Sequence, residues 1–318
     1  MTPAARLSAA IEVIHIIDAN RIPAAQALKE WGTAHRFAGS GDRAAIAGLV
    51  WDVLRRRSSS AWLMDADTAR ARVLGMLRLE RGMDTEAIAA LCDGGRFAPE
   101  PLSDAERAAL TSRSIEGAPA HIAGDYPEWL DTHLAAVFGD DRVAEATAMA
   151  SRAPLDLRVN TLKGKREKVL ASLRHLGAKE TPWSPIGLRI ELGADARNPG
   201  IHAEEDFLKG AIEVQDEGSQ LAALLSAAKP GEQVIDLCAG AGGKTLALAA
   251  MMQGKGRLIA TDHDKRQLAP IHERTMRPPF SPASIMRAMM FEGVAKPMPI
   301  EPPLREKIAV LMPIRRPS

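Results

Sequence analysis

The chain has 318 residues and a formal net charge of +1, with 46% hydrophobic and 25% charged residues. These values are ordinary for a globular protein of about two or three domains, and they exclude a chain whose overall charge would by itself attract a nucleic acid. Two cysteines exclude a disulfide framework and a cysteine-rich metal cluster, and they favour a reducing cytoplasm as the setting.

Residues 1–150 are predicted to be all-helical. In the first segment Leu7, Ile11, Ile14 and Ile17 recur at helical spacing. Charged residues interrupt this segment, so we expect neither a signal peptide nor a membrane span.

Further helix signals follow along this region. The segment at 41–57 has the same periodicity and ends in Arg55, Arg56 and Arg57, which favour a helix C-terminus. Ser103 followed by Glu106 predicts a capping box at the start of another helix. Cys92, near the end of a helical segment, is interpreted as a small core residue.

A small α+β module is predicted at residues 151–210, because alternating apolar and polar residues replace the helical period. A glycine, Gly177, closes its helix. The predicted elements are a strand at 155–160, a helix at 165–177, and strands at 187–192 and 211–215.

Residues 211–275 are predicted to begin a Rossmann-like α/β domain. Two apolar strands, at 233–237 and 256–262, flank a helix at 244–253, and another helix at 216–228 precedes them. This strand–helix–strand order predicts a parallel sheet with a right-handed crossover.

The turn between the first strand and its helix reads VIDLCAGAGGKT, residues 234–245. Glycines in such a turn leave backbone N–H groups open at the start of the helix and let a ligand approach closely. A dinucleotide fingerprint would need a third glycine where Thr245 stands, after Gly240 and Gly242, so that match is partial.

Two other ligand classes use this kind of turn. A phosphate-binding P-loop matches at Gly243, Lys244 and Thr245, but Cys238 stands where its first glycine is required. The third class is the adenosyl part of S-adenosylmethionine. Asp262 follows the second strand, 19 residues beyond Gly243, which is the spacing expected of a ribose-binding acid. Its alternative role is to cap the following helix.

Three stretches together carry a family resemblance. EVQDEGSQLAALL, DLCAGAGGKTLALA and ATDHDKRQLAPIHER resemble the Sun-type (RsmB-like) RNA cytosine-5 methyltransferases, and PLDLRVNTLK is similar to the start of that family's RNA-binding module. The helical N-terminal third resembles the family's NusB-like domain. The resemblance implies S-adenosylmethionine as cofactor and ribosomal RNA as partner. It assigns the cofactor site to Cys238, Ala239, Gly240, Ala241, Gly242, Gly243, Lys244 and Asp262.

The chemistry of this family requires a cysteine nucleophile, carried by a Thr-Cys-Ser segment and assisted by an Asp-Ala-Pro-Cys segment. Neither segment is present, and no cysteine follows Cys238. Residues 276–318 are rich in proline and methionine and are expected to form a divergent tail, which is too short to complete the sheet. We therefore assign no catalytic residue and expect an incomplete methyltransferase domain.

A basic stripe lies within the small module. Between Arg158 and Lys179 the chain carries seven Lys or Arg and one acid, Glu167, and such a stripe can bind phosphates or simply face solvent. Arg55, Arg56 and Arg57 form a weaker second candidate. Trp183 is the nearest aromatic side chain that could stack on a base, unless it belongs to the core. The candidate RNA-binding residues are Arg158, Lys163, Lys165, Arg166 and Lys168.

Three functions remain open on the sequence. The first is a homologue of the RNA cytosine-5 methyltransferases that methylate ribosomal RNA, but one that is catalytically incomplete. The second is a non-catalytic RNA-binding protein that uses residues 1–210. The third is a P-loop-like nucleotide-binding protein.

Overall fold

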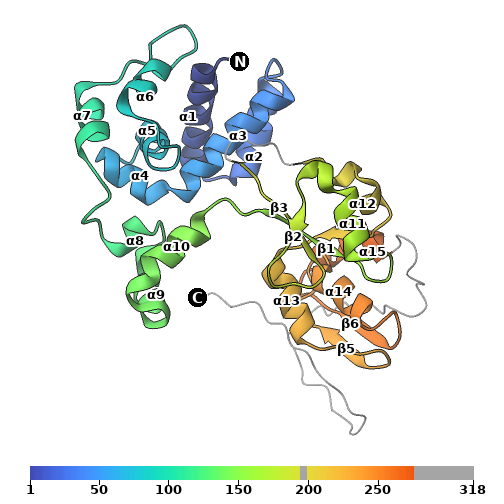
Figure 1. Cartoon of the computed structure of the whole chain (residues 1–318). Coiled ribbons are helices and arrows are strands. Elements are labelled where there is room, and N and C mark those ends of the chain that lie inside the picture. The colour runs from blue at the N-terminus through green and yellow to red at the C-terminus, as the bar shows by residue number, and fades with distance from the viewer. Residues whose placement is uncertain (194–198, 276–318) are drawn as a thin grey trace. The chain divides into compact units, whose positions relative to one another are not determined.

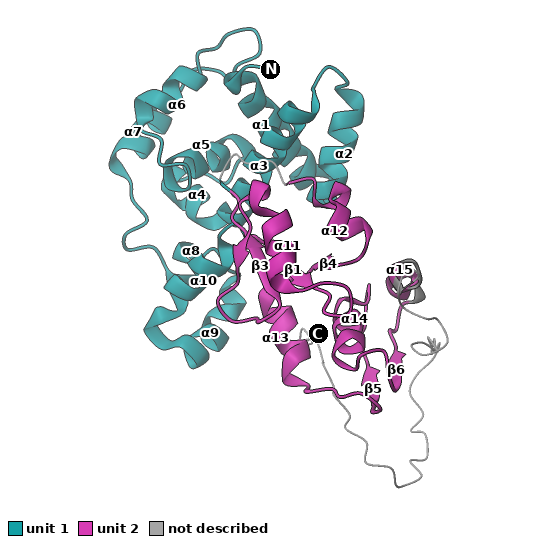
Figure 2. Cartoon of the chain, turned by 45° about the vertical axis from the view of Figure 1, so that its right-hand side comes forward, with its two compact units in different colours: residues 1–153, 193–197 teal, residues 154–192, 198–318 magenta. Residues whose placement is uncertain are grey.

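The computed structural model describes residues 1–193 and 199–275, and these fall into two compact units (Figure 1, Figure 2). Unit 1 holds residues 1–153 together with Gly193, and unit 2 holds residues 154–192 and 199–275. The tail expected at 276–318 lies outside the described residues.

Unit 1 is built of helices, which confirms the helical prediction for its residues. The helices α1 to α7 share one hydrophobic core, formed by residues such as Leu7, Ile14, Ile46, Val50 and Leu74. The α-helices of unit 1 are α1 Pro3–Asn20, α2 Ala24–Ala34, α3 Ser40–Arg55, α4 Arg57–Met64, α5 Ala69–Leu79, α6 Thr85–Leu91, α7 Asp104–Ser112, α8 Ala120–Ala123, α9 Asp131–Phe138 and α10 Arg142–Ala150.

Local signals in unit 1 fall where the sequence predicts them, with one addition. The capping box of Ser103 and Glu106 is present at the start of α7. Helix α3 ends at Arg55, but a new helix, α4, begins only two residues later at Arg57. The arginine run therefore separates two helices.

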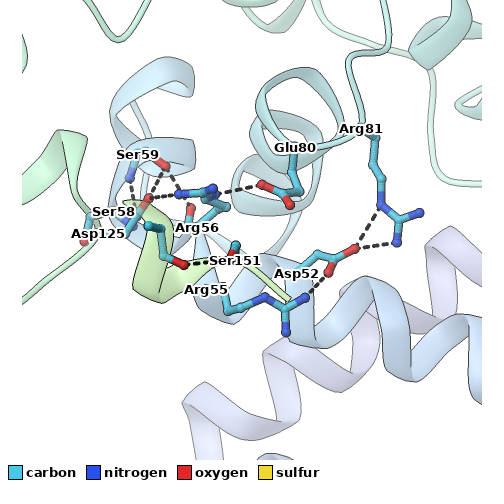
Figure 3. A network of polar contacts seen from close by, with 10 residues as sticks. Asp52, Arg55, Arg56, Ser58, Ser59, Glu80, Arg81, Asp125 and Ser151 are labelled. Carbon is cyan, nitrogen blue, oxygen red and sulfur yellow. Dashed lines mark hydrogen bonds and ion pairs between the residues drawn. The ribbon is translucent and has the colours of Figure 1, made fainter. Parts of the chain in front are cut away.

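Asp125 connects the segment that contains α8, α9 and α10 with the other helices of unit 1. Its Oδ1 accepts hydrogen bonds from the amides of Ser58 and Ser59, both at 2.8 Å, in the first turn of α4 (Figure 3). The carboxylate thus caps a helix that lies more than sixty residues earlier in the chain.

Unit 2 begins with a four-stranded antiparallel sheet in the order β2-β3-β1-β4. One face is apolar and packs against α11 and α12 through residues such as Leu157, Leu188, Val169 and Phe207. The elements are β1 Leu155–Val159, α11 Arg166–Ser172, β2 Lys179–Glu180, β3 Gly187–Ile190, α12 Glu205–Leu208 and β4 Ile212–Val214. Strand β2 is not predicted from the sequence, and β4 lies just beyond the module boundary that we expected at residue 210.

The other face of this sheet, here called the polar face, carries Asp156, Arg158, Arg189 and Glu213. Asp156 stands opposite Arg189, and Arg158 stands opposite Glu213, so opposite charges face each other across β1. Asp156, Arg158 and Glu213 are buried, although the strand alternates as if this face met solvent. The polar face is therefore internal to unit 2.

The last part of unit 2 is a short parallel sheet, as predicted. Its strands pair in register from Gln233 with Arg257 to Asp236 with Ala260. Ala228, Val234, Leu248 and Leu258 are among the residues of one small core at this sheet. The elements are α13 Glu217–Leu225, β5 Gln233–Asp236, α14 Gly243–Met251, β6 Arg257–Ala260 and α15 Lys265–Thr275. Among all the described residues, no helix is both long and apolar enough to cross a membrane.

Two helical glycines give a test of the packing in unit 1. A Cβ at Gly75 of α5 would lie 2.5 Å from the Ser60 carbonyl oxygen, whereas one at Gly48 of α3 would meet only Arg81 Nη2, at 3.9 Å. We expect Gly75→Ala to destabilise the fold by about 1–3 kcal/mol through overpacking. We expect Gly48→Ala to stabilise it by up to about 1 kcal/mol, because alanine is the better helix former. Urea unfolding followed by circular dichroism measures both, and equal shifts would contradict the close approach of α4 and α5.

Candidate cofactor-binding site

The glycine turn of residues 237–242 follows β5 and leads directly into α14. Gly240 and Gly242 have φ values of 52° and 82°, in the left-handed region that favours glycine. A Cβ at Gly242 would also lie 2.5 Å from Ile271 Cγ1 of α15. Glycine at 242 is therefore required by its backbone conformation and by the close packing of α15.

Asp262 lies beside this turn, as the spacing predicts. Its Oδ2 accepts a hydrogen bond from the Gly240 amide at 3.0 Å, and its Oδ1 accepts one from the Asp264 amide at 3.1 Å. Desolvation of the carboxyl opposes ionisation, but these amide hydrogen bonds and His263 outweigh it and lower the pKa of Asp262. The structure thus brings an ionised carboxylate to the glycine turn.

The alternative role of Asp262 as a helix cap is not what the structure shows. Helix α15 begins at Lys265, and the side chain of Asp264 accepts the hydrogen bond from the Arg266 amide at 2.9 Å. Asp264 therefore caps the helix, and Asp262 is left to contact the turn.

Asp236 and Thr245 form a buried pair behind the turn that the sequence analysis did not single out. The Thr245 hydroxyl donates to Asp236 Oδ2 at 2.7 Å, and both residues are 1% exposed. Burial raises the pKa of Asp236. A P-loop would use the hydroxyl of Thr245 to bind magnesium, but here that hydroxyl is committed to Asp236, which weighs against the P-loop hypothesis. The sequence does contain a signal that could have predicted this pair: an acid at the end of the strand, followed by a threonine in the first turn of the helix.

The remaining predicted cofactor residues line the turn with different exposure. Cys238 and Ala241 are exposed, Ala239 is buried, and Gly243 and Lys244 are half-buried. The ammonium group of Lys244 is close enough to Asp236 to favour its ionised form. The turn therefore offers an open backbone surface with one cation at the start of α14.

Arg274 of α15 joins the turn to the small sheet. Its Nη1 donates to the Ala241 carbonyl oxygen at 2.6 Å, and its Nη2 forms an ion pair with Glu213 at 2.6 Å. Glu213 belongs to the polar face of the sheet and is itself buried. One arginine thus fixes both the glycine turn and strand β4.

The prediction that Arg158 binds RNA is wrong. Arg158 is 1% exposed, its Nε donates to Gln215 Oε1 at 2.5 Å, and burial lowers its pKa to about 10. Its Nη1 has no hydrogen-bond partner. A side chain in this position is part of the polar face and cannot reach an RNA backbone outside.

The other residues of the stripe differ among themselves. Lys165 and Lys168 are exposed, so they are free to meet phosphates. Lys163 is half-buried, with its Nζ donating to the Lys209 carbonyl oxygen at 2.7 Å. Arg166 is largely occupied within the fold, since it donates to the carbonyl oxygens of Thr181 and Gly187 and pairs with Glu180 at 3.3 Å. The stripe is therefore narrower than the sequence suggests.

The second basic candidate is also occupied, as Figure 3 shows. Arg55 pairs with Asp52, and Arg56 pairs with Glu80 at 2.8 Å and with Asp125 at 3.8 Å. These two arginines are structural parts of unit 1.

Arg57 and Cys92 complete the candidates of unit 1. Arg57 is half-exposed and lies 3.8 Å from each of Asp18 and Asp67. Cys92 follows the end of α6 and is 3% exposed in the core, where burial raises the pKa of its thiol. A protonated, buried thiol agrees with its interpretation as a core residue.

Comparison with protein families finds matches in two segments. Residues 126–197 match the ferredoxin-like domain of RsmF/B-like methyltransferases, and residues 223–292 match the 16S rRNA methyltransferase RsmB/F family. Together they confirm the family resemblance seen in the sequence, and the first match covers most of the predicted α+β module.

Curated relatives and a solved structure agree with these matches. Ribosomal RNA small subunit methyltransferase B of Pseudomonas putida is 32% identical over 155 residues, 48% of this chain and 34% of the relative. A probable methyltransferase of the same description from Synechocystis is 34% identical over 142 residues, 43% of this chain and 30% of the relative. The chain thus spans about a third of the length of these relatives. The crystal structure of PH0851 matches 91% of this chain and 69% of its own, with a TM-score of 0.62 and 22% identity, which shows a shared fold.

The contacts of Arg274 predict how the glycine turn responds to its loss. Arg274→Met removes the hydrogen bond to Ala241 and leaves Glu213 without its ion-pair partner in α15. We expect hydrogen exchange of the amides in residues 238–243 to become about ten- to a hundredfold faster, the equivalent of ~1.5–3 kcal/mol for hydrogen bonds to a charged group. Mass spectrometry of deuterium uptake measures this.

A matched control for this variant lies on the same helix. Arg266 pairs with Asp264 and its side chain is 87% exposed, so Arg266→Met is expected to leave the exchange of the turn unchanged. Equal protection of the turn in both variants would show that Arg274 does not hold it.

Proposed function

We propose, from the relationship of this chain to the RsmB/F-like ribosomal RNA methyltransferases, that unit 2 binds S-adenosylmethionine at the glycine turn and RNA on the small module. The methyltransferases of that family depend on S-adenosylmethionine. The observation that carries the proposal is the carboxylate of Asp262, held ionised against the Gly240 amide at the end of the second parallel strand. This placement is the one expected for an acid that accepts hydrogen bonds from ribose hydroxyls.

The residues present fit this cofactor. Asp262 is the residue for the ribose hydroxyls, and the glycines at 240, 242 and 243 permit close approach to the backbone. Lys244 offers a positive charge for the carboxylate of the cofactor. When bound, S-adenosylmethionine supplies a methyl group on a positively charged sulfur. The hydroxyl of Thr245 holds Asp236 and so supports the start of α14 from behind.

The RNA-binding part of the proposal rests on the small module and its exposed lysines. Lys165 and Lys168 are free to contact phosphates, and the relatives matched by the chain are ribosomal RNA methyltransferases. Ribosomal RNA is therefore the proposed partner, in the reducing cytoplasm expected from the sequence. For unit 1 we propose a NusB-like domain, and its all-helical fold supports this proposal.

Methyl transfer itself is not part of the proposal for these 318 residues. The two thiols are Cys92, in the core of unit 1, and Cys238, exposed in the glycine turn. A cytosine-5 methyltransferase of this kind needs a thiolate that adds to the base. Cys238 belongs to the cofactor site and Cys92 is buried, so we propose that the chain binds the methyl donor and RNA without completing the reaction.

Calorimetric titration with S-adenosylmethionine tests the donor site. We expect the wild-type chain to bind and Asp262→Ala to bind at least tenfold more weakly, because an ionised acceptor of hydroxyl groups is lost, at about 1.5–3 kcal/mol. Asp264→Ala, which removes the cap of α15 two residues away, is the matched control and is expected to keep most of the affinity. Thermal stabilisation by ATP with magnesium but not by S-adenosylmethionine would instead support the P-loop hypothesis.

An assay for 5-methylcytosine tests the absence of transfer. The purified chain, incubated with S-adenosylmethionine labelled in its methyl group and with ribosomal RNA, is expected to leave the RNA unlabelled. Label that appears in 5-methylcytosine would overturn the proposal. If it disappears in Cys238→Ser while calorimetry shows that this variant still binds S-adenosylmethionine, Cys238 is the nucleophile.

A further inference from the structure

We propose that Trp183 is a stacking platform for one unpaired RNA base, with Lys165 and Lys168 binding the phosphates beside that base. This inference rests on the RNA-binding part of the proposed function and names the form of RNA that the small module takes. It takes up the stacking role that the sequence left open for Trp183, beside the alternative of a place in the core.

Trp183 is 74% exposed, although two other residues of its loop are buried. Thr181 is 5% exposed and Ser184 is 1% exposed in the same loop between β2 and β3. Tryptophan is usually well buried in folded proteins. Thr181 and Ser184 anchor the loop in the fold, whereas Pro182, Trp183 and Pro185 are exposed, so the indole is available for a ligand.

The backbone that carries this indole is fixed by a buried carboxylate. Glu217 Oε1 accepts hydrogen bonds from the amides of Trp183 and Ser184, at 2.7 and 2.8 Å. Hydrogen bonds from these amides lower the pKa of Glu217 in spite of its desolvation, so the carboxylate stays ionised. The amide of Gly187 closes the loop by donating to the Ser184 carbonyl oxygen at 3.2 Å. A ligand that stacks on Trp183 therefore has little backbone ordering to offset.

Cations lie next to this loop. Arg166 donates to the carbonyl oxygens of Thr181 and Gly187, at 3.2 and 3.0 Å, so the start of α11 lies against the loop. Figure 1 shows α11 beside β2 and β3. Lys165, directly before Arg166, and Lys168, two residues after it, are both exposed.

The acids near these lysines do not cancel their charge. Glu180 is paired with Arg166, at 3.3 Å. A third lysine, Lys179 of β2, is also exposed. Three exposed lysines therefore stand against one acid of α11, Glu167. The exposed charges at the start of α11 and on β2 are therefore net positive, which is complementary to a phosphate backbone.

An exposed aromatic ring beside lysines fits single-stranded RNA better than other ligands. A ring can stack on a base only when the base is not already stacked in a duplex, and such stacking tolerates any sequence. Lysine gives phosphate contacts without base selectivity. We therefore expect a preference for unpaired RNA over duplex RNA at this surface.

Binding of a short single-stranded oligoribonucleotide, followed by fluorescence anisotropy over a range of salt concentrations, tests the proposal. Trp183→Ala is expected to weaken binding by roughly five- to a hundredfold, the range of base–aromatic stacking. Its salt dependence is expected to match the wild type, because no phosphate contact is lost. Trp183→Phe is expected to recover most of the affinity, since it restores a ring, and a duplex of the same sequence is expected to show little effect of either variant.

Replacing the two lysines gives the complementary result. In the double variant Lys165→Gln and Lys168→Gln two phosphate contacts are lost. Each contact to a single strand contributes about 0.7 to the slope of log affinity against log salt, so the slope is expected to fall by about 1.4. Trp129→Ala is the matched control for the indole, because Trp129 is also exposed, at 57%, but has Glu128 and Asp131 beside it. We expect it to bind RNA as the wild type does.

Each other outcome has a defined meaning. Unchanged affinity of Trp183→Ala for the single strand overturns the stacking proposal while leaving RNA binding intact, and so does an equal loss in Trp129→Ala. Unchanged RNA affinity together with a shift in sedimentation of Trp183→Ala identifies the indole as a protein contact. A wild-type chain that binds no single strand contradicts the RNA-binding proposal as a whole. Trp183→Ala is expected to bind S-adenosylmethionine as the wild type does, which would show that its effect on RNA binding does not come from the donor site.

Discussion

The paired charges on the polar face of the small sheet are the constraint on which unit 2 depends. Asp156 accepts two hydrogen bonds from Arg189, at 2.7 and 2.8 Å, and a third from the Glu217 amide at 3.0 Å. Removing a carboxylate from water costs several kcal/mol, and such a buried group is tolerable only when its oxygens are fully hydrogen-bonded. Asp156 lies on β1 and its partners come from β3 and from the first residue of α13, so satisfying one charge connects three elements.

Both proposed binding surfaces are attached to this face. At one end Glu217 holds the loop that carries Trp183. At the other end Glu213 holds Arg274, which in turn holds the glycine turn at Ala241. Because both acids are buried, a substitution in the polar face is expected to disturb both surfaces at once. That is a reason to probe each surface with exposed residues.

The sequence predicts most of unit 2 but not the polar face. Alternation identified β1, β3 and β4, and the glycine turn with Asp262 identified the site, because these signals are local. Arg158 was misplaced because alternation shows which residues share a face, but not what covers that face. Part of its cover, Gln215 and α13, comes from a segment more than fifty residues further along the chain. Trp183 was unresolved for the same reason, since its exposure depends on a contact with Glu217. Asp236 and Thr245 both belong to the glycine motif, yet only the fold shows that the Thr245 hydroxyl donates to Asp236 in the interior.

The short connection between β4 and α13 indicates that the proposed RNA surface and the proposed donor site are held in a fixed position relative to each other. Only Gln215 and Asp216 separate the strand from the helix, and Gln215 also accepts from Arg158 of the polar face. A linker of two residues, one of them buried in a hydrogen-bonded network, leaves no hinge between the small sheet and α13, and α13 packs on α14 of the parallel sheet. Under the proposed function, RNA and methyl donor are therefore presented in a fixed relation by unit 2. That relation depends on the polar face, because its buried charges connect the loop of Trp183 with the glycine turn.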